Sequence, residues 1–131
     1  MLFRSRRPGP YQVQAAIAAL HARAPRPEDT DWAEIATLYG VLARMQPSPV
    51  VRLNLAVAVA MADGPEHGLH LIDQLEPELA GYHLFHASRA DLLRRLDRPD
   101  EAEAAYRRAI ELATNPTERA FLERRLADLA G

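Results

Sequence analysis

The segment from Tyr82 to Pro116 constrains the fold more than any other part of the chain. It predicts two helices joined by a tight turn, with small residues at the positions where two helix backbones must approach each other. Ala90 holds such a position on the first helix, and Ala102 and Ala109 hold two on the second. Tyr106 supplies a bulky side chain between those two alanines. The segment therefore predicts a closely packed helix pair.

A weaker copy of this pattern lies about 34 residues upstream, which is the period of a tetratricopeptide repeat. Such a repeat is a helix–turn–helix unit that stacks on its neighbours. The register shift places Ala90 on Ala56, Leu93 on Val59, Ala102 on Gly68, Tyr106 on Ile72 and Ala109 on Leu75. We therefore interpret the chain as a short helical-repeat module.

Composition agrees with an all-α fold. Hydrophobic residues make up 48% of the 131 residues, but aromatic residues only 6%, and the abundance of alanine and leucine favours helices over strands. A chain of this length suits one domain with a modest core. We expect a flexible, cationic lead-in at 1–9 and one tetratricopeptide-like domain at 10–131, built as a short right-handed superhelix of about seven helices in antiparallel pairs.

Capping residues and prolines set the expected helix boundaries. The run of small and apolar residues at 49–62 predicts the central, most buried helix, and Gly68 marks a close approach on the next helix. The last helix resembles a capping helix, with Phe121, Leu122, Leu126 and Leu129 on one side. The expected helices are 10–23, the segment from the Asp31 cap to the stop at Pro47, 49–62, 66–75, the pair within 82–116, and the cap from Asn115 to about 131, with a loop or single turn at 76–81.

Charge and residue usage exclude several classes of function. The 16 basic residues are all arginine and stand against 18 acidic residues, so a net charge of −2 lacks the electrostatic footprint of a nucleic-acid binder. The absence of cysteine excludes disulfides, thiolate metal sites and cysteine nucleophiles. No apolar run approaches the ~20 residues that span a bilayer, and no apolar stretch of a signal peptide follows Arg7. We expect a cytoplasmic protein without a membrane contact.

Two groups of polar residues are candidates for a site. Asp91, Arg94, Arg95 and Arg125 occupy positions that repeat geometry would place on a concave surface, where they form either a groove for an acidic peptide or partner domain, or a solvated charged face. His83 and His86, like His67 and His70, stand three residues apart and could share a metal ion, but no carboxylate stands in an obvious ligand position one turn away. Hydrogen-bonded structural histidines are the favoured interpretation, and we expect no catalytic site, cofactor or metal.

An ordered series of segments resembles one family along nearly the whole chain. The segments are GPYQVQAAIAALHA at 9–22, TDWAEIATLY at 30–39, PSPVVRLNLAVAVA at 47–60, GYHLFHASRADLLRRL at 81–96 and AEAAYRRAIELATNPTERAFLERRL at 102–126. Together they resemble the C-terminal tetratricopeptide-like extension of a group of bacterial extracytoplasmic-function RNA polymerase sigma factors. In that group the extension follows two regions that bind DNA and polymerase, and neither region has a counterpart in this sequence. The family also has a basic residue after the position of Asn54, where this chain has Leu55, with Arg52 as a candidate replacement.

The resemblance implies a non-enzymatic regulatory domain that modulates transcription initiation through protein contacts, without binding nucleic acid by itself. Its implied partners are the core regions of the sigma factor or RNA polymerase, and a YCII-related protein with a DGPF motif. A free-standing helical-repeat adaptor that binds a small ligand, a peptide or a metal, the metal through His83 and His86, is the alternative. The positions that match the family are Tyr11, Gln14, His21, Trp32, Asn54, Tyr82, His83, His86, Arg89 and Arg119.

Overall fold

The computed structural model describes residues 9–130, and within them the fold is all-α, as predicted. Of the lead-in expected at 1–9, residues 1–8 lie outside the described residues. The helix count is eight rather than about seven because the single turn at 76–81 forms a short helix, α5. The elements are α1 (Pro10–Arg23), the 3-10 turn η2 (Pro27–Asp29), α2 (Trp32–Met45), α3 (Pro49–Asp63), α4 (Pro65–Asp73), α5 (Glu76–Leu79), α6 (His83–Arg95), α7 (Pro99–Leu112) and α8 (Pro116–Ala130).

The predicted caps set the helix starts. The Asp31 carboxylate accepts a hydrogen bond from the Glu34 amide at 3.1 Å and opens α2. The Ser48 hydroxyl accepts one from the Val50 amide at 3.2 Å and opens α3. At α8, Asn115 Oδ1 accepts from the Thr117 amide at 2.8 Å and from the Glu118 amide at 3.2 Å. Each cap satisfies backbone donors that a helix start leaves without a partner, so these boundaries are confirmed.

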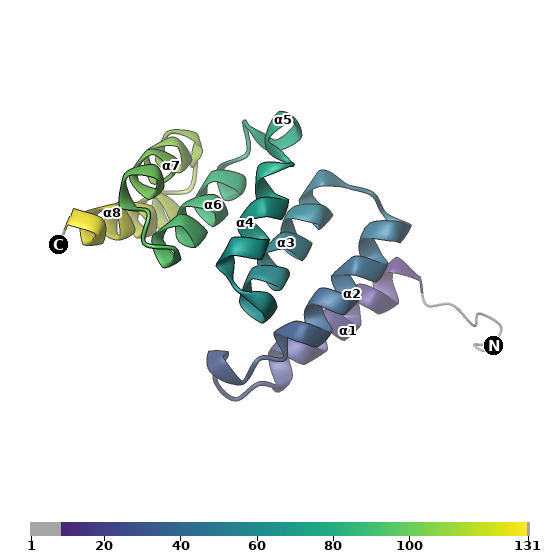
Figure 1. Cartoon of the computed structure of the whole chain (residues 1–131). Helices are drawn as coiled ribbons and strands as arrows, with labels where there is room; N and C mark the ends of the chain where they lie inside the picture. The colour runs from purple at the N-terminus through teal and green to yellow at the C-terminus, as the bar shows by residue number, and fades with distance from the viewer. Residues whose placement is uncertain (1–8, 131) are drawn as a thin grey trace, which may run out of the picture.

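The helices follow one another in a row from the N-terminal to the C-terminal end of the molecule (Figure 1). Contacts join mainly helices that are neighbours in the sequence, and α4 also packs on α6. Two hydrophobic clusters result, one among α1, α2 and α3 and a larger one from α3 to α8. Helix α3 belongs to both, since Ala58 lies in the first cluster and Ala56 in the second. It is central as predicted, but it is not the most buried helix, because α6 and α7 each bury as many residues.

The close approach predicted at Gly68 is confirmed. A Cβ atom built on Gly68 would lie 2.3 Å from the Ala60 Cβ and 2.9 Å from the Ala56 carbonyl oxygen, both on α3. Helices α3 and α4 therefore pack backbone against backbone at this point, a contact that only glycine permits. Glycine inside a helix lowers its stability by about 1 kcal/mol relative to alanine. Helix α4 bears this cost at the position where its contact with α3 requires glycine.

The pair α6 and α7 is also packed as predicted. Ala90, Ala102 and Ala109 are completely buried, and Tyr106 between the two alanines of α7 is 2% exposed. The turn between these helices places Asp97 in the left-handed region, with φ 58°.

Helix α8 covers the C-terminal end of the larger cluster through Leu122, which is buried, and through the half-buried Leu126 and Leu129. The prediction that Phe121 shares this face is wrong, since its side chain is 47% exposed. The reason is helical geometry: Leu122, Leu126 and Leu129 follow the i, i+4, i+7 spacing of one face, whereas Phe121 lies about 100° away from Leu122 around the axis. In the part of the chain that the structure describes, no helix combines the length and apolar character needed to cross a membrane.

Candidate functional site

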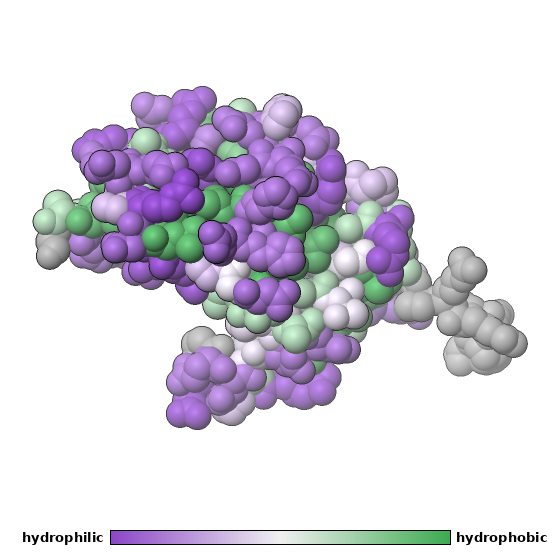
Figure 2. All heavy atoms as spheres, in the orientation of Figure 1, coloured by the Kyte–Doolittle hydropathy of each residue, from purple (hydrophilic) through white to green (hydrophobic). Residues whose placement is uncertain are grey.

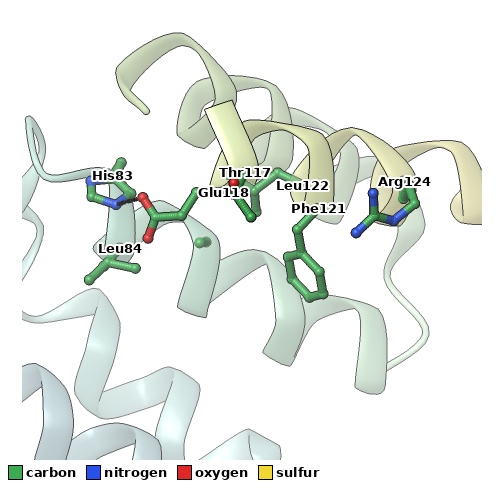
Figure 3. Close-up of a pocket in the computed structure, with 8 residues that line it drawn as sticks. His83, Leu84, Thr117, Glu118, Phe121, Leu122 and Arg124 are labelled. Atoms are coloured by element: carbon green, nitrogen blue, oxygen red, sulfur yellow. Dashed lines mark ion pairs between the residues drawn. The ribbon is translucent and has the colours of Figure 1, made fainter. Parts of the chain in front are cut away.

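A hollow of about 420 Å³ lies between the start of α6 and the exposed side of α8. It forms because α8 packs onto the core through Leu122 and leaves the neighbouring face of its first three turns directed along α6. Figure 3 shows side chains from both helices converging on it. The lining residues are His83, Leu84 and Ala87 from α6, and Thr117, Glu118, Phe121, Leu122 and Arg124 from α8. We call this hollow the α6–α8 groove.

One end of the groove is closed by a polar pair that joins the two helices. His83 Nε2 lies 3.0 Å from Glu118 Oε1, as the dashed line in Figure 3 marks. The imidazole is largely buried, at 22% exposure, and the carboxylate is 42% exposed. The distance suits an ion pair when the imidazole is protonated, but the angles do not meet the criteria of a hydrogen bond. We therefore regard the pair as an electrostatic contact rather than a hydrogen bond.

The middle of the groove is apolar and open to solvent. Leu84 is 39% exposed and Phe121 is 47% exposed, while Ala87 leaves space between them. Figure 2 shows hydrophobic atoms gathered among hydrophilic ones over the C-terminal half of the molecule, where α6 and α8 lie in Figure 1. These two side chains give the hollow a mainly apolar lining, as ligand-binding clefts commonly have.

The other end of the groove is cationic. Arg124 lines it, and the Arg125 guanidinium lies 5.2 Å from the centre of the Phe121 ring, within cation–π range. Among residues 9–130, neither arginine has a carboxylate within ion-pair distance, whereas arginines on α6 and α7 are paired with acidic neighbours. The groove thus runs from a His–Glu pair, across an apolar centre, to Arg124, and Arg125 lies on the adjoining surface.

The predicted concave-surface residues are brought together only in part. Arg94 and Arg125 line a second hollow of about 350 Å³ at the far ends of α6 and α8, together with Asp97, Pro99, Asp128 and Leu129. Asp91 and Arg95 do not line it. Asp91 instead pairs with both Arg94 and Arg95 on its own helix, with 2.9 Å from Arg95 Nε to Asp91 Oδ2. These three residues therefore form an ion-pair cluster along α6.

Arg94 is held firmly in its charged state. Its hydrogen bond to Asp91 raises the pKa of the guanidinium above its ordinary value, with a smaller contribution from the Tyr106 hydroxyl, against the opposing effect of burial. That hydroxyl is buried and makes no hydrogen bond of standard geometry, so its contact with Arg94 is weaker than the ion pair. Arg94 thus joins the α6 surface to the core of the α6–α7 pair.

Four of the polar residues that match the family make contacts within the domain, whereas Tyr11 is 86% exposed. His86 Nε2 lies 2.6 Å from the Ala80 carbonyl oxygen, which agrees with a hydrogen-bonded structural histidine. Arg89 Nε donates to Asp73 Oδ1 at 2.7 Å and ties α6 to α4. Arg119 donates to the Ala113 carbonyl oxygen at 2.7 Å and ties α8 to the end of α7. Tyr82 precedes α6 and packs against the larger cluster.

Arg52, the candidate replacement for a missing basic residue, also has a structural partner. Its guanidinium donates to both carboxylate oxygens of Glu78 at 2.9 Å and connects α3 to α5. Trp32 is only partly buried and packs its ring edge to face with His21 at 5.3 Å. Trp32 therefore packs against the hydrophobic cluster of α1, α2 and α3 without being enclosed by it.

The histidine pairs do not gather a metal-binding set. His83 is directed at Glu118, while His86 contacts a backbone carbonyl oxygen. On α4, His70 contacts Gln74 at 3.2 Å and His67 lies 3.9 Å from Asp63. Within the described ranges, no three histidine or carboxylate side chains come close enough together to hold an ion.

Sequence reasoning missed the residues that form the groove, apart from His83. Leu84 follows a histidine and precedes the buried Phe85, and Phe121 was assigned to the wrong face. A helical wheel drawn through Leu122, Leu126 and Leu129 would have placed Phe121 and Arg124 outside the buried face. Which helix lies beside that exposed face depends on tertiary packing and has no local signal.

The chain resembles one curated relative closely. It is 57% identical over 127 residues to an uncharacterized protein of Rhizobium meliloti (strain 1021). The match covers 97% of this chain but only 30% of the relative, so the chain spans less than a third of that protein's length. No family model matches the chain.

Proposed function

We propose that this chain is the C-terminal regulatory and protein-interaction domain of an extracytoplasmic-function RNA polymerase sigma factor. The observation that carries this proposal is the α6–α8 groove, an open apolar surface with a cationic end. It offers shape, apolar area and charge, which are the means by which proteins recognise one another. We assign the domain no catalytic role.

The helix spacing supports a tetratricopeptide-like, right-handed superhelix with α8 as its cap. Helix α3 starts at Pro49 and α6 at His83, and α4 starts at Pro65 and α7 at Pro99, so both pairs of starts differ by 34 residues. Nine of the ten residues matched by that shift are buried, and the tenth, Val59, is half-buried. In such an array α6 and α8 are first helices of consecutive units, and the groove between them belongs to the concave surface.

Sequence supports the assignment to a sigma factor. The five segments that resemble the sigma-factor extension run from Gly9 to Leu126 in the order found in that family. The Rhizobium relative is more than three times as long as the matched region, which leaves room for polymerase- and promoter-binding regions in that protein. On this proposal the domain works in the cytoplasm of a bacterium. Its partners are the sigma-factor core regions or RNA polymerase, with a YCII-related DGPF-motif protein as a further candidate.

The alternative is a free-standing helical-repeat adaptor for a small ligand or peptide. It is favoured by the volume of the groove, about 420 Å³, which falls within the range of small-molecule sites, roughly 300–1,000 Å³. Metal binding by His83 and His86 is the least supported form of this alternative, since His86 contacts a backbone carbonyl oxygen.

Transcription in vitro tests the proposal directly. The full-length Rhizobium relative, and the same protein without the region that matches this chain, are each combined with core RNA polymerase on genomic DNA, and transcript 5′ ends are mapped. We expect defined start sites with the full-length protein, altered output after the deletion, and no promoter binding by the isolated chain. The sigma-factor assignment fails if the full-length protein directs no initiation, or if the isolated chain binds a promoter specifically.

A further inference from the structure

We propose that the α6–α8 groove binds a short segment of a partner protein in which a carboxylate stands next to an apolar side chain. This inference rests on the proposed function only in taking the occupant to be a protein. It names the place of binding and the chemistry of the segment, and it assigns the contacts to Leu84 and Phe121 for the apolar side chain and to Arg124 for a carboxylate.

The apolar part of the argument comes from the exposure of two large side chains in one place. Five large hydrophobic residues are exposed among those described, and two of them, Leu84 and Phe121, line the same groove. Ala87 between them leaves room for an incoming side chain. Covering these two residues removes apolar surface from water, which favours association. The groove volume of about 420 Å³ suits one or two side chains rather than a whole domain.

The charge part of the argument comes from the arginines of α8. On α6 and α7, Arg89, Arg94, Arg95, Arg107 and Arg108 each lie within ion-pair distance of an aspartate or glutamate. Arg124 and Arg125 have no such partner in the described part of the chain, although Asp128 lies on the same surface. At the opposite end, Glu118 already faces His83. The uncompensated charge beside the apolar centre is therefore positive, and it complements a carboxylate.

The two features lie next to each other. Phe121 lines both the groove and the adjoining surface of Arg124 and Arg125, and the Arg125 guanidinium lies 5.2 Å from its ring centre. Figure 3 shows Phe121 and Arg124 extending from successive turns of α8. A segment that places an apolar side chain against Phe121 therefore brings its neighbouring residues within reach of Arg124. Guanidinium groups bind carboxylates through paired, charge-assisted hydrogen bonds.

Fluorescence anisotropy with three labelled peptides tests the proposal on the purified chain. The probe is Ser-Asp-Glu-Leu-Phe-Asp-Glu-Ser. The second peptide has lysine in place of every acidic residue, and the third has alanine in place of leucine and phenylalanine. We expect saturable binding of the probe, at least about tenfold weaker binding of the other two peptides, and weaker probe binding as the salt concentration rises.

Substitutions test whether the probe peptide binds in the groove. Arg124→Glu, and Leu84→Ser combined with Phe121→Ser, should each weaken probe binding by about tenfold or more. Arg44→Glu on α2 and Val50→Ser on α3 are matched exposed controls outside the groove and should leave it unchanged. Circular dichroism checks the fold of every variant, and Arg124→Ala replaces any charge reversal that fails to fold.

The proposal is overturned if the probe shows no saturable binding, if the lysine peptide binds equally well, or if the control variants weaken binding as much as the groove variants. Failure of peptide binding can be distinguished from failure of the transcription test. A groove that binds nothing in a domain whose deletion alters initiation contradicts only the present inference. A groove that binds the probe in a protein without sigma activity contradicts only the sigma-factor assignment.

Discussion

His83 Nε2 of α6 and Glu118 Oε1 of α8 lie 3.0 Å apart and connect the first turns of two helices that are separated in sequence by the whole of α7. Because Glu118 is 42% exposed, solvent screens the interaction, and we expect a coupling free energy of only about 0.2–1 kcal/mol. A double-mutant cycle with His83→Ala and Glu118→Ala, followed by urea unfolding, measures it. Additive effects of the two substitutions would show that the contact contributes nothing. Glu123→Ala on the same helix serves as the control.

Gly68 supports a different kind of contact, and Gly68→Ala should lower the free energy of unfolding by about 1–3 kcal/mol. The new methyl group would lie 2.3 Å from the Ala60 Cβ, so α3 and α4 must move apart. Gly40→Ala is the matched control, since a Cβ at Gly40 meets nothing within 4 Å and Gly40 lies inside α2. That control should raise stability by roughly 0.5–1 kcal/mol. Equal effects of the two substitutions in chemical denaturation would contradict the close packing of α3 on α4.

Two substitutions of Tyr106 separate the contributions of its ring and of its hydroxyl group to the free energy of unfolding. The side chain is 2% exposed and the hydroxyl lacks a hydrogen bond of standard geometry, a state that costs about 1–3 kcal/mol for a buried polar group. Tyr106→Phe should therefore leave the free energy of unfolding unchanged or raise it by up to about 1 kcal/mol. Tyr106→Ala should lower it by about 3–5 kcal/mol through the cavity it leaves. A loss of more than about 1 kcal/mol in Tyr106→Phe would mean that the hydroxyl is well bonded to Arg94.

Local signals in the sequence predicted the helices well. Asp31, Ser48 and Asn115 act within three residues of their own positions, so their caps are readable without knowledge of the tertiary fold. The small residues of α6 and α7 were equally informative, because alanine at helical spacing permits close helix packing. The extra helix α5 is a single turn, and sequence does not distinguish such a turn from a loop.

The candidate site was less predictable, because it depends on which helices become neighbours. Asp91, Arg94 and Arg95 were expected on a concave surface, either as a binding groove or as a solvated charged face. Their i, i+3 and i, i+4 spacing on one helix instead lets them pair with one another. Phe121 was assigned to the same side of the last helix as Leu122, yet its position beside Leu122 turns it away from the core. The contact of His83 with Glu118 spans 35 residues, and no local pattern indicates it.

Gly64 forms the whole connection between α3 and α4, and its backbone conformation makes a further prediction. Its φ of +109° and ψ of 151° lie in a region that residues with a side chain rarely adopt, although a Cβ there would meet no atom within 4 Å. Gly64→Ala should therefore cost about 1–3 kcal/mol through backbone strain alone. Gly81→Ala is the matched control, since a Cβ at Gly81 also meets nothing within 4 Å and no positive φ is required there. Thermal unfolding of both variants checks this, and equal midpoints would show that the α3–α4 turn relaxes to a conformation that alanine tolerates.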